Sequence, residues 1–247
     1  MNIVLLGHQD IASLFALNRL VDLIPNHHYT AFTSGELTPK DPAPDALAAL
    51  AVADRTLHDQ YLAEFPVADV LRSATEWTAP NSPEGLQLLA DCDADLIVSI
   101  RYRRILREQV IAIPRKGVLN LHSGILPDYR GVMATFWAML NEEPEIGATL
   151  HWIVDSGIDT GPEIGISRAR TRPEESYLAN VLRLTIEGCN MMAAAIETLS
   201  SRKNIKLNAP RAVGQGRYYS TPDAEAIECF SAKGLKLVLG NELGLIS

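Results

Sequence analysis

The chain has 247 residues, a formal net charge of −8 and an apolar fraction of 47% with few aromatic residues. This length allows a sizeable core and favours one compact soluble α/β protein with at most a small appendage. No apolar stretch approaches the ~20 residues that span a bilayer. The acidic balance disfavours an extended nucleic-acid surface, so transfer RNA is a less favoured substrate on charge alone.

The first elements predict a β-turn-α unit of the doubly wound kind. Residues 1–7 are an apolar run that ends in glycine and has no basic region before it, so we expect a strand and not a signal peptide. An amphipathic pattern from Ile11 to Leu23 predicts a helix. The turn at residues 8–10 is not glycine-rich and offers few N–H groups to a phosphate, which argues against a dinucleotide cofactor. His8 in this turn is a candidate substrate contact; a solvated or N-capping role is the alternative.

Further strands and helices alternate toward the middle of the chain. We expect strands over residues 28–33 and 95–100, and helices over residues 45–53 and 84–89. His27 and His28 point to opposite sides of a strand and no suitably spaced ligand accompanies them, so no metal is predicted. The cysteines are odd in number and scattered, which favours a reducing cytoplasm over a disulfide framework: Cys92, Cys189 and Cys229.

The centre of the chain carries the residues most suited to chemistry. Residues 118–121 predict a buried strand, and Asn120 and His122, two apart, leave it on the same side. A second strand is expected over residues 148–154, and Asp159 follows it in a glycine-flanked turn. An amide, an imidazole and a carboxylate are therefore expected to converge on one centre. His151, in the second strand, has a structural and a functional interpretation of equal weight.

At these positions the chain resembles the folate-dependent formyltransferases, which move a formyl group from 10-formyltetrahydrofolate to an amine. The shared pattern is Asn-x-His at 120–122, Leu-Pro-x-Tyr-Arg-Gly at 126–131 and Asp-x-Gly-x-Asp-Thr-Gly at 155–161. More thinly, the resemblance runs from the first strand to about residue 200. It implies a doubly wound, mostly parallel, Rossmann-like sheet. The chain departs from the family at Ser123-Gly124, where Pro-Ser is common, which leaves the backbone beside the imidazole freer.

The resemblance also implies where the folate co-substrate binds. In the family, the segment after the strand at 95–100 lies along the pterin pocket, at the end of the sheet where doubly wound folds bind ligands. Carried over by position, the candidate folate-binding residues are Tyr102, Arg103, Arg104, Leu106 and Ile111, together with Asp155, Ser156 and Gly157 of the second motif. Guanidinium groups suit the carboxylates of a folate tail, and an ordinary solvated turn is the alternative for the arginines.

The remaining elements are a helix, a strand and a long helix, followed by a tail of different character. We expect a helix over residues 134–140, a strand over 161–170, a helix from 173 to 199, a helix over 223–232 and a strand-like run over 235–239. We predict a formyltransferase catalytic domain at residues 1–204 and a short C-terminal extension at residues 205–247. Tyr218 and Tyr219 in this extension resemble the tail of family members that act on nucleotide-linked amino sugars; a tail that covers a sheet edge is the alternative.

Formyl transfer to an amine requires donors for an oxygen that gains charge and a route for the amine proton. Asn120 and protonated His122 are suitable donors, and Asp159 would pair with His122 and relay the proton. The predicted acceptor is an amino sugar, with a nucleotide-linked one favoured, in contact with His8, Tyr129, Arg130, Tyr218 and Tyr219. A homodimer is left open, and a membrane partner is not expected.

Several alternatives are weighed against this hypothesis. A hydrolase triad with Ser123 is weak, because adjacent Ser and His do not easily form the required geometry and no Gly-x-Ser-x-Gly elbow is present. A non-catalytic folate-binding regulatory protein would not need the intact Asn, His and Asp set. Another small amine or a carrier-bound aminoacyl group are alternative acceptors. A methionyl-tRNA formyltransferase is disfavoured by the short tail, and a glycinamide ribonucleotide enzyme by the lack of a phosphate cradle at residues 8–10.

Overall fold

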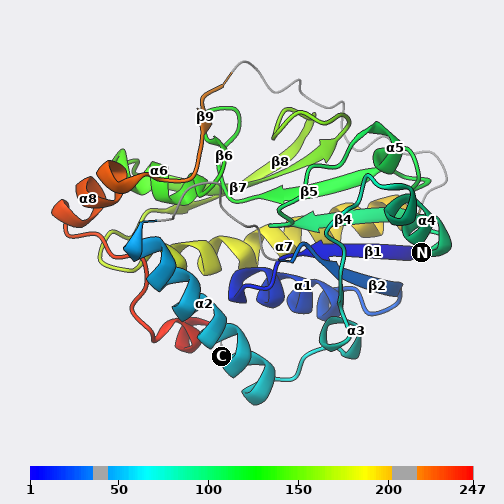
Figure 1. Cartoon of the computed structure of the whole chain (residues 1–247), viewed down its shortest axis with the longest axis horizontal. Coiled ribbons are helices and arrows are strands. Elements are labelled where there is room, and N and C mark those ends of the chain that lie inside the picture. The colour runs from blue at the N-terminus through cyan, green and yellow to red at the C-terminus, as the bar shows by residue number, and fades with distance from the viewer. Residues whose placement is uncertain (36–43, 202–215, 247) are drawn as a thin grey trace.

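A seven-stranded sheet forms the centre of the fold in the computed structural model, which describes residues 1–35, 44–201 and 216–246 (Figure 1). The strand order is β3-β2-β1-β4-β5-β7-β8. The strands are β1 (Asn2–Gly7), β2 (His28–Thr33), β3 (Thr75–Glu76), β4 (Leu96–Ile100), β5 (Val118–His122), β7 (Glu145–Ile153) and β8 (Glu163–Arg170). The five strands from β3 to β5 run parallel, while β7 and β8 pair antiparallel. The expected doubly wound, mostly parallel sheet is confirmed.

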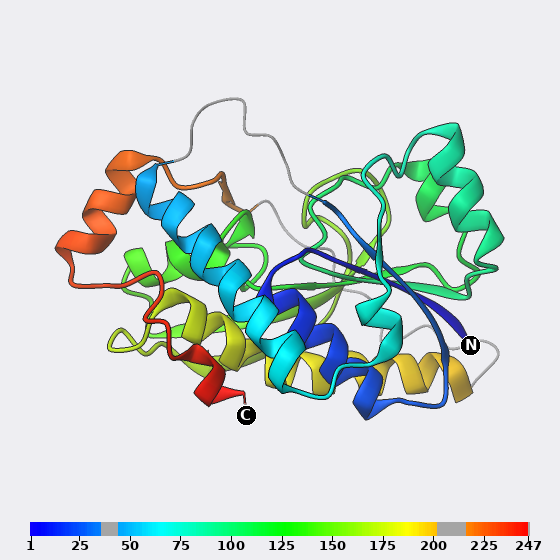
Figure 2. The ribbon, with the colours of Figure 1, turned by 60° about the horizontal axis from the view of Figure 1, so that its bottom comes forward.

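Helices cover both faces of the sheet, because the parallel strands are apolar on both sides. The helices are α1 (Ile11–Leu23), α2 (Asp45–Glu64), α3 (Asp69–Arg72), α4 (Pro83–Asp91), α5 (Glu108–Ile111), α6 (Ala134–Leu140), α7 (Tyr177–Ser201) and α8 (Ala224–Ala232), with a 3₁₀ helix at Glu242–Leu245. Figure 2 shows α1, α2 and α7 on one face and α4 and α5 on the other. Two apolar clusters match these layers: Leu5 and Ile196 lie in the larger, and Leu6 and Val110 in the smaller.

Local signals account for most element boundaries. Asp10 caps α1 by accepting the Ser13 N–H at 2.7 Å, Ser82 caps α4 and Asp223 caps α8. The helix expected from residue 173 begins instead at Tyr177, because the Ser176 hydroxyl accepts the Ala179 N–H at 3.0 Å. The helix expected over residues 45–53 continues to residue 64 as α2.

The strand-like interpretation of residues 235–239 is wrong. This segment lies against the start of α7, where the carbonyls of Lys236 and Leu237 accept the N–H groups of Tyr177 and Leu178 at 2.8 and 3.1 Å. Those N–H groups at a helix start have no partner within the helix. The apolar run therefore caps a helix instead of joining a sheet.

The described part of the C-terminal extension packs on the rest of the fold. A short parallel pair joins β9 (Tyr218–Tyr219) to β6 (Arg130–Gly131), beside one end of the large sheet (Figure 1). In α8, the Phe230 ring stacks on Phe136 of α6 with centroids 4.4 Å apart. The predicted boundary between residues 204 and 205 lies outside the described residues.

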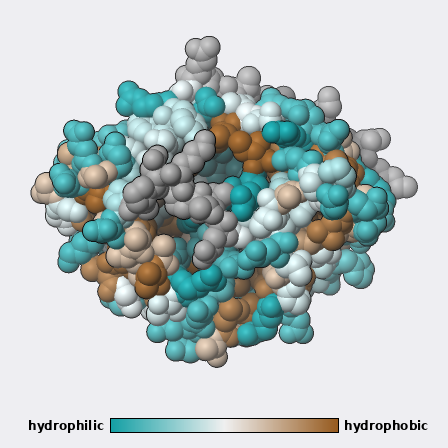
Figure 3. Space-filling view, viewed as in Figure 1, coloured by the Kyte–Doolittle hydropathy of each residue, from teal (hydrophilic) through white to brown (hydrophobic). Residues whose placement is uncertain are grey.

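The surface mixes hydrophilic and hydrophobic residues. On the face shown in Figure 3 it is hollowed in the region between β6 and β8, and a hydrophobic patch borders the hollow. Within the described ranges, no helix combines the length and apolar character required to cross a membrane.

Candidate active site

The residues singled out in the central motifs meet beside the carboxyl end of β5, an interior strand of the sheet. Asn120 and His122 lie on β5, which pairs with β4 on one side and with β7 on the other. Asp159 lies in the loop between β7 and β8, where its backbone adopts a left-handed conformation with φ of 53°. Asp is among the few non-glycine residues that tolerate this conformation. The loop thereby turns the carboxylate back toward β5.

His122 is held between a carboxylate and a backbone carbonyl. Its Nδ1 lies 3.4 Å from Asp159 Oδ2, and its Nε2 lies 2.6 Å from the carbonyl oxygen of Tyr129. A carbonyl only accepts hydrogen bonds, so Nε2 carries a hydrogen. A second hydrogen on Nδ1 would face the carboxylate. The structure thus brings two of the predicted catalytic residues, His122 and Asp159, into contact.

Asp159 is a buried carboxylate with several partners. Burial opposes its charge, but His122, a hydrogen bond with His151 and the Gly131 N–H together lower its pKa from 3.8 to about 2. The Gly131 N–H donates to Oδ2 at 2.8 Å. The Leu-Pro-x-Tyr-Arg-Gly loop therefore contacts both members of the pair, through the Tyr129 carbonyl to the imidazole and through the Gly131 N–H to the carboxylate.

Asn120 reaches the same centre through His151. Its Nδ2 lies 2.9 Å from His151 Nε2, and His151 Nε2 is 3.5 Å from Asp159 Oδ1. His151 Nδ1 faces the Trp152 carbonyl at 3.0 Å, while its Nε2 faces both the Asn120 amide and the Asp159 carboxylate. Sequence reasoning left the role of His151 open. The only signal would have been its register opposite Asn120 across the antiparallel pair.

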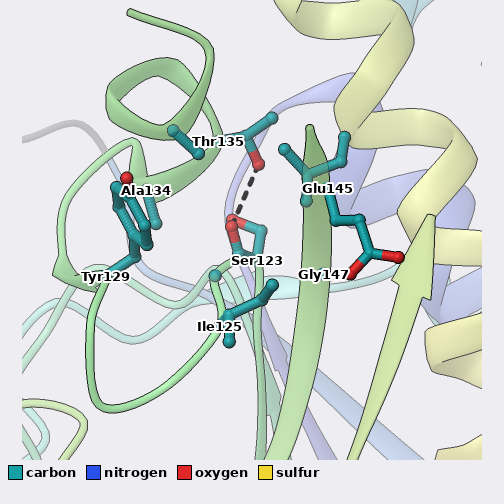
Figure 4. Close-up of a pocket in the computed structure, with 10 residues that line it drawn as sticks. Ser123, Ile125, Tyr129, Ala134, Thr135, Glu145 and Gly147 are labelled. Atoms are coloured by element: carbon teal, nitrogen blue, oxygen red, sulfur yellow. Dashed lines mark hydrogen bonds between the residues drawn. The ribbon is translucent and has the colours of Figure 1, made fainter. Parts of the chain in front are cut away.

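Gly124, where the chain departs from the resembled family, is required by the packing around His122. A Cβ built on it would lie 2.6 Å from His122 Nε2, from the Tyr129 carbonyl oxygen and from Ala134 Cβ. The expectation of a freer backbone here is wrong, because neighbouring atoms surround the glycine. The Ser123 carbonyl also accepts a hydrogen bond from the Thr135 hydroxyl at 3.0 Å (Figure 4).

Two cavities lie along this loop. The smaller one, shown in Figure 4, has a volume of about 10 Å³ and lies among Ser123, Tyr129, Thr135 and Gly147, so it holds no more than a water. The larger is an open groove of about 390 Å³ that is lined in part by Asp128, Glu143, Arg168 and Tyr219.

The two segments predicted to bind folate lie next to each other. Ser156 lies beside Glu108 of α5, where the pKa of the Glu108 carboxyl is lowered by its own backbone and by the side chain and backbone of Ser156. Asp155 turns its own loop by accepting the Gly157 N–H at 2.8 Å. Leu106 is buried, and Tyr102 and Ile111 pack against the same cluster. The structure places these residues together, and their contact with folate stays a prediction.

The arginines of this segment are tied to the first turn. Asp10 is 2% exposed and lies 2.9 Å from Arg101 Nε and 3.3 Å from Arg103 Nη2. Burial opposes the charge of Asp10, but the two guanidinium groups outweigh this effect of burial and lower the pKa of Asp10 to about 2. Arg104 Nε donates to the Ser34 carbonyl at 3.0 Å. Sequence reasoning missed the role of Asp10, because its partner Arg101 is 91 residues away.

His8, the predicted substrate contact in the first turn, belongs to this neighbourhood. Its Nδ1 lies 2.8 Å from the Ser34 hydroxyl. Burial and the positive charge of Arg103 lower its pKa to about 4. His8 is therefore neutral near pH 7. It follows the carboxyl end of β1. Because β1, β4 and β5 run parallel, this is the same end of the sheet as the β5 residues.

The other predicted acceptor contacts divide into covered and open side chains. Tyr129 is 7% exposed and donates its hydroxyl to Glu143 at 2.7 Å, and Tyr219 has rings on both faces. These rings leave no free face of Tyr219 for a nucleobase. Both tyrosines line the larger groove, and their contact with an acceptor stays a prediction. Tyr218 is 49% exposed, and Arg130 donates twice to the Ile158 carbonyl, at 3.0 and 2.9 Å.

Metal ligands do not gather in the part of the chain that the structure describes. No group of three or more His, Cys, Asp or Glu side chains is placed to hold an ion there. The three cysteines are free thiols, and Cys189 is buried.

Comparison with known proteins places these motifs in a family. The formyl transferase family matches residues 51–195. A methionyl-tRNA formyltransferase of Thermosynechococcus vestitus is 33% identical over 120 residues, which cover 49% of this chain and 35% of that protein. Another, of Mycobacterium avium, is 29% identical over 194 residues, covering 76% of this chain and 55% of that protein. The chain thus spans about a third to a half of the length of these relatives.

A solved structure supports the same fold. The N-formyltransferase of Helicobacter canadensis, in complex with folinic acid and dTDP-3-aminofucose, superposes with a TM-score of 0.53 and 17% identity, covering 89% of this chain and 71% of that one. The family match covers more than half of the chain and includes the Asn-x-His, Leu-Pro-x-Tyr-Arg-Gly and Asp-x-Gly-x-Asp-Thr-Gly motifs. The protein therefore belongs to the formyl transferase family.

Proposed function

We propose that this chain transfers a formyl group from 10-formyltetrahydrofolate to the amine of a small acceptor, with Asn120, His122 and Asp159 as the catalytic residues. The observation that carries the proposal is the contact between His122 Nδ1 and the buried Asp159 carboxylate at 3.4 Å, beside an Asn120 amide linked to the same carboxylate through His151. Family membership supplies the reaction class.

The chemistry assigns a role to each residue. When the amine adds to the formyl carbon, the formyl oxygen gains negative charge, and a positioned N–H donor stabilises that charge. An amide nitrogen has two hydrogens, so Asn120 Nδ2 is able to bond His151 and a reacting oxygen together. The amine loses a proton as the new C–N bond forms, and the folate nitrogen gains one as the old bond breaks. Asp159, beside His122, receives the first proton through water, and the same water returns it to the folate nitrogen, so that the proton lost by the amine is the one the leaving group gains.

We propose a nucleotide-linked amino sugar as the acceptor. The support is threefold: the net charge of −8, the non-glycine turn at residues 8–10, and the likeness in fold to an N-formyltransferase solved with dTDP-3-aminofucose. Of the two tyrosines of the extension that are predicted to contact the acceptor, Tyr218 is the more exposed, at 49%. Formylation of methionyl-tRNA is the second candidate, because that is the function of the relatives at 29–33% identity.

Single substitutions test the catalytic assignment. We expect His122→Ala and Asp159→Asn to fold, to retain binding of 5-formyltetrahydrofolate measured by calorimetry, and to lose most turnover. Proton transfer by a positioned side chain typically contributes about 10²–10⁴-fold, so kcat should fall by roughly that factor. His28→Ala, at an exposed position of β2, is the matched control and should keep wild-type turnover. Near wild-type activity of either site variant would refute the assignment.

A panel of acceptors tests the substrate. Purified protein with 10-formyltetrahydrofolate is assayed against dTDP- and UDP-linked amino sugars, glycinamide ribonucleotide and methionyl-tRNA. Tyr218→Ala should raise KM for the sugar acceptor and leave KM for folate unchanged. Turnover of methionyl-tRNA alone would replace the sugar proposal with the second candidate. Folate binding without turnover of any amine would favour a regulatory protein.

A further inference from the structure

The C-terminal strand β9 is joined to the loop that holds the catalytic pair. The Arg130 N–H donates to the Arg217 carbonyl at 3.0 Å, and the Val132 N–H donates to the Tyr219 carbonyl at 2.9 Å. Gly131, between these two bonds, has φ of 96°, and a Cβ on it would lie 2.2 Å from the Tyr219 oxygen. Only glycine allows this approach. The two backbones are therefore in direct contact along the length of β6.

The residues that β9 pairs with are those that hold the Asp159 loop. The Gly131 N–H donates to the Asp159 carboxylate at 2.8 Å, and the Arg130 guanidinium donates twice to the Ile158 carbonyl, at 3.0 and 2.9 Å. Asp159 has a positive φ, a conformation that surrounding contacts must maintain. The position of the carboxylate therefore depends on β6, and the position of β6 depends on β9.

The Tyr219 side chain supports the other partner, His122. Its ring is stacked between Tyr129, with centroids 5.3 Å apart and planes at 7°, and Trp137, at 5.1 Å and 27°. Its hydroxyl oxygen accepts hydrogen bonds from Asn141 Nδ2 and Arg217 Nη1, each at 3.2 Å. The Tyr129 carbonyl oxygen lies 2.6 Å from His122 Nε2. Because the Tyr219 ring is packed on both faces and hydrogen-bonded at its hydroxyl, it holds Tyr129 in place. The Tyr129 carbonyl in turn orients the His122 imidazole.

We propose that Tyr219 is a positioning residue for the reaction: through its ring it aligns Tyr129 and His122, and through its backbone it aligns Gly131 and Asp159. The inference rests on the proposed function. It gives the C-terminal extension a role in the chemical step and not only in acceptor binding. A positioning role predicts a loss in kcat, whereas an acceptor contact predicts a rise in KM for the acceptor.

The test compares Tyr219→Leu with Tyr219→Phe in the full chain. Tyr219→Leu removes the stack, and we expect kcat to fall by roughly 10- to 100-fold, since a misplacement of about 1 Å costs about 10²-fold. KM for folate and acceptor should change by less than about threefold, because neither would lose a direct contact. Tyr219→Phe keeps both stacked faces and should recover most of kcat. Phe65→Ala is the matched control, because Phe65 is a half-buried ring stacked on Tyr61 at 4.8 Å, away from the site.

A second readout does not depend on turnover. The chain has six histidines, so ¹⁵N-histidine spectra are assignable by single substitutions. In Tyr219→Leu the His122 ring nitrogen signals should shift, because the bond to the Tyr129 carbonyl is disturbed, while those of exposed His28 stay unchanged. Phe65→Ala should leave both unchanged. This spectrum also reports whether the variant is folded.

The outcomes separate this inference from the proposed function. A lowered kcat with shifted His122 signals supports it. Unchanged His122 signals in folded Tyr219→Leu, or a raised acceptor KM with unchanged kcat, overturn it. A wild-type protein that turns over no acceptor overturns the proposed function alone, and the His122 spectra still decide whether Tyr219 orients the imidazole.

Discussion

Gly124→Ala inserts one methyl group into the contact between His122 and the Tyr129 carbonyl. The new Cβ would lie 2.6 Å from three heavy atoms, whereas ordinary van der Waals contact begins at 3.4 Å. The neighbours must therefore retreat by about 0.8 Å in a region where Ala134 is fully buried and Tyr129 nearly so. Overpacking of this kind costs ~1–3 kcal/mol. We expect the free energy of unfolding to fall by about that amount.

The same displacement should be felt in turnover. A shift near 1 Å at a reacting group costs about 10²-fold in rate, so kcat should fall by roughly one to two orders of magnitude. Urea unfolding gives the stability change, and formyl transfer at saturating substrates gives kcat. Gly244→Ala is the control, because a Cβ there meets nothing within 4 Å, and it should be neutral in both assays. A Gly124→Ala variant with wild-type stability and kcat would refute the packing argument.

Three further predictions concern buried or half-buried polar groups. Asn120→Asp should abolish turnover, because a carboxylate cannot donate to the developing oxyanion and repels it; retained kcat would remove Asn120 from the site. Burial, with the negative charge of Asp10, raises the pKa of Asp54 to about 6, so Asp54 costs stability as pH rises above 4. A pKa unit corresponds to about 1.4 kcal/mol, so Asp54→Asn should stabilise the protein by up to ~3 kcal/mol at pH 8 and leave its stability unchanged at pH 4. Equal urea midpoints for the two proteins at pH 8 would contradict this. Asp10→Asn leaves Arg101 without its buried carboxylate, so the free energy of unfolding measured in urea above pH 4 should fall by ~3–5 kcal/mol. The difference between the two proteins should shrink toward pH 2, where wild-type Asp10 is itself protonated. A loss below about 1 kcal/mol above pH 4 would show that the pair is solvated.

Local patterns in the sequence were enough to locate most elements. The strand at residues 28–33 and the helix at residues 134–140 match β2 and α6 at both ends, because apolar spacing and turn residues act within a few positions of each other. The contact between His122 and Asp159 was expected from the motifs, but strand ends do not explain it. His122 ends β5, whereas the end of β7 pairs with the start of β5, so the loop after β7 must fold back to bring Asp159 to the imidazole.

Contacts across long separations were decided only by the tertiary structure. The run at residues 235–239 is apolar enough for a strand, but its carbonyls meet the first N–H groups of α7, which have no partner within the helix. Nothing near Gly124 in the sequence indicates that Tyr129 and Ala134 surround it. Nor does the pattern around Tyr219 show that Tyr129 and Trp137 cover its two faces.

The division has one physical cause. Periodicity, capping and turn chemistry are properties of a few consecutive residues, so the sequence by itself determined the order of elements and the family motifs. The partners of Asp10, Gly131 and Tyr219 are chosen by how whole elements dock, and docking depends on packing summed over the fold. Only the tertiary structure could therefore decide that β9 lies against the loop that holds His122 and Asp159.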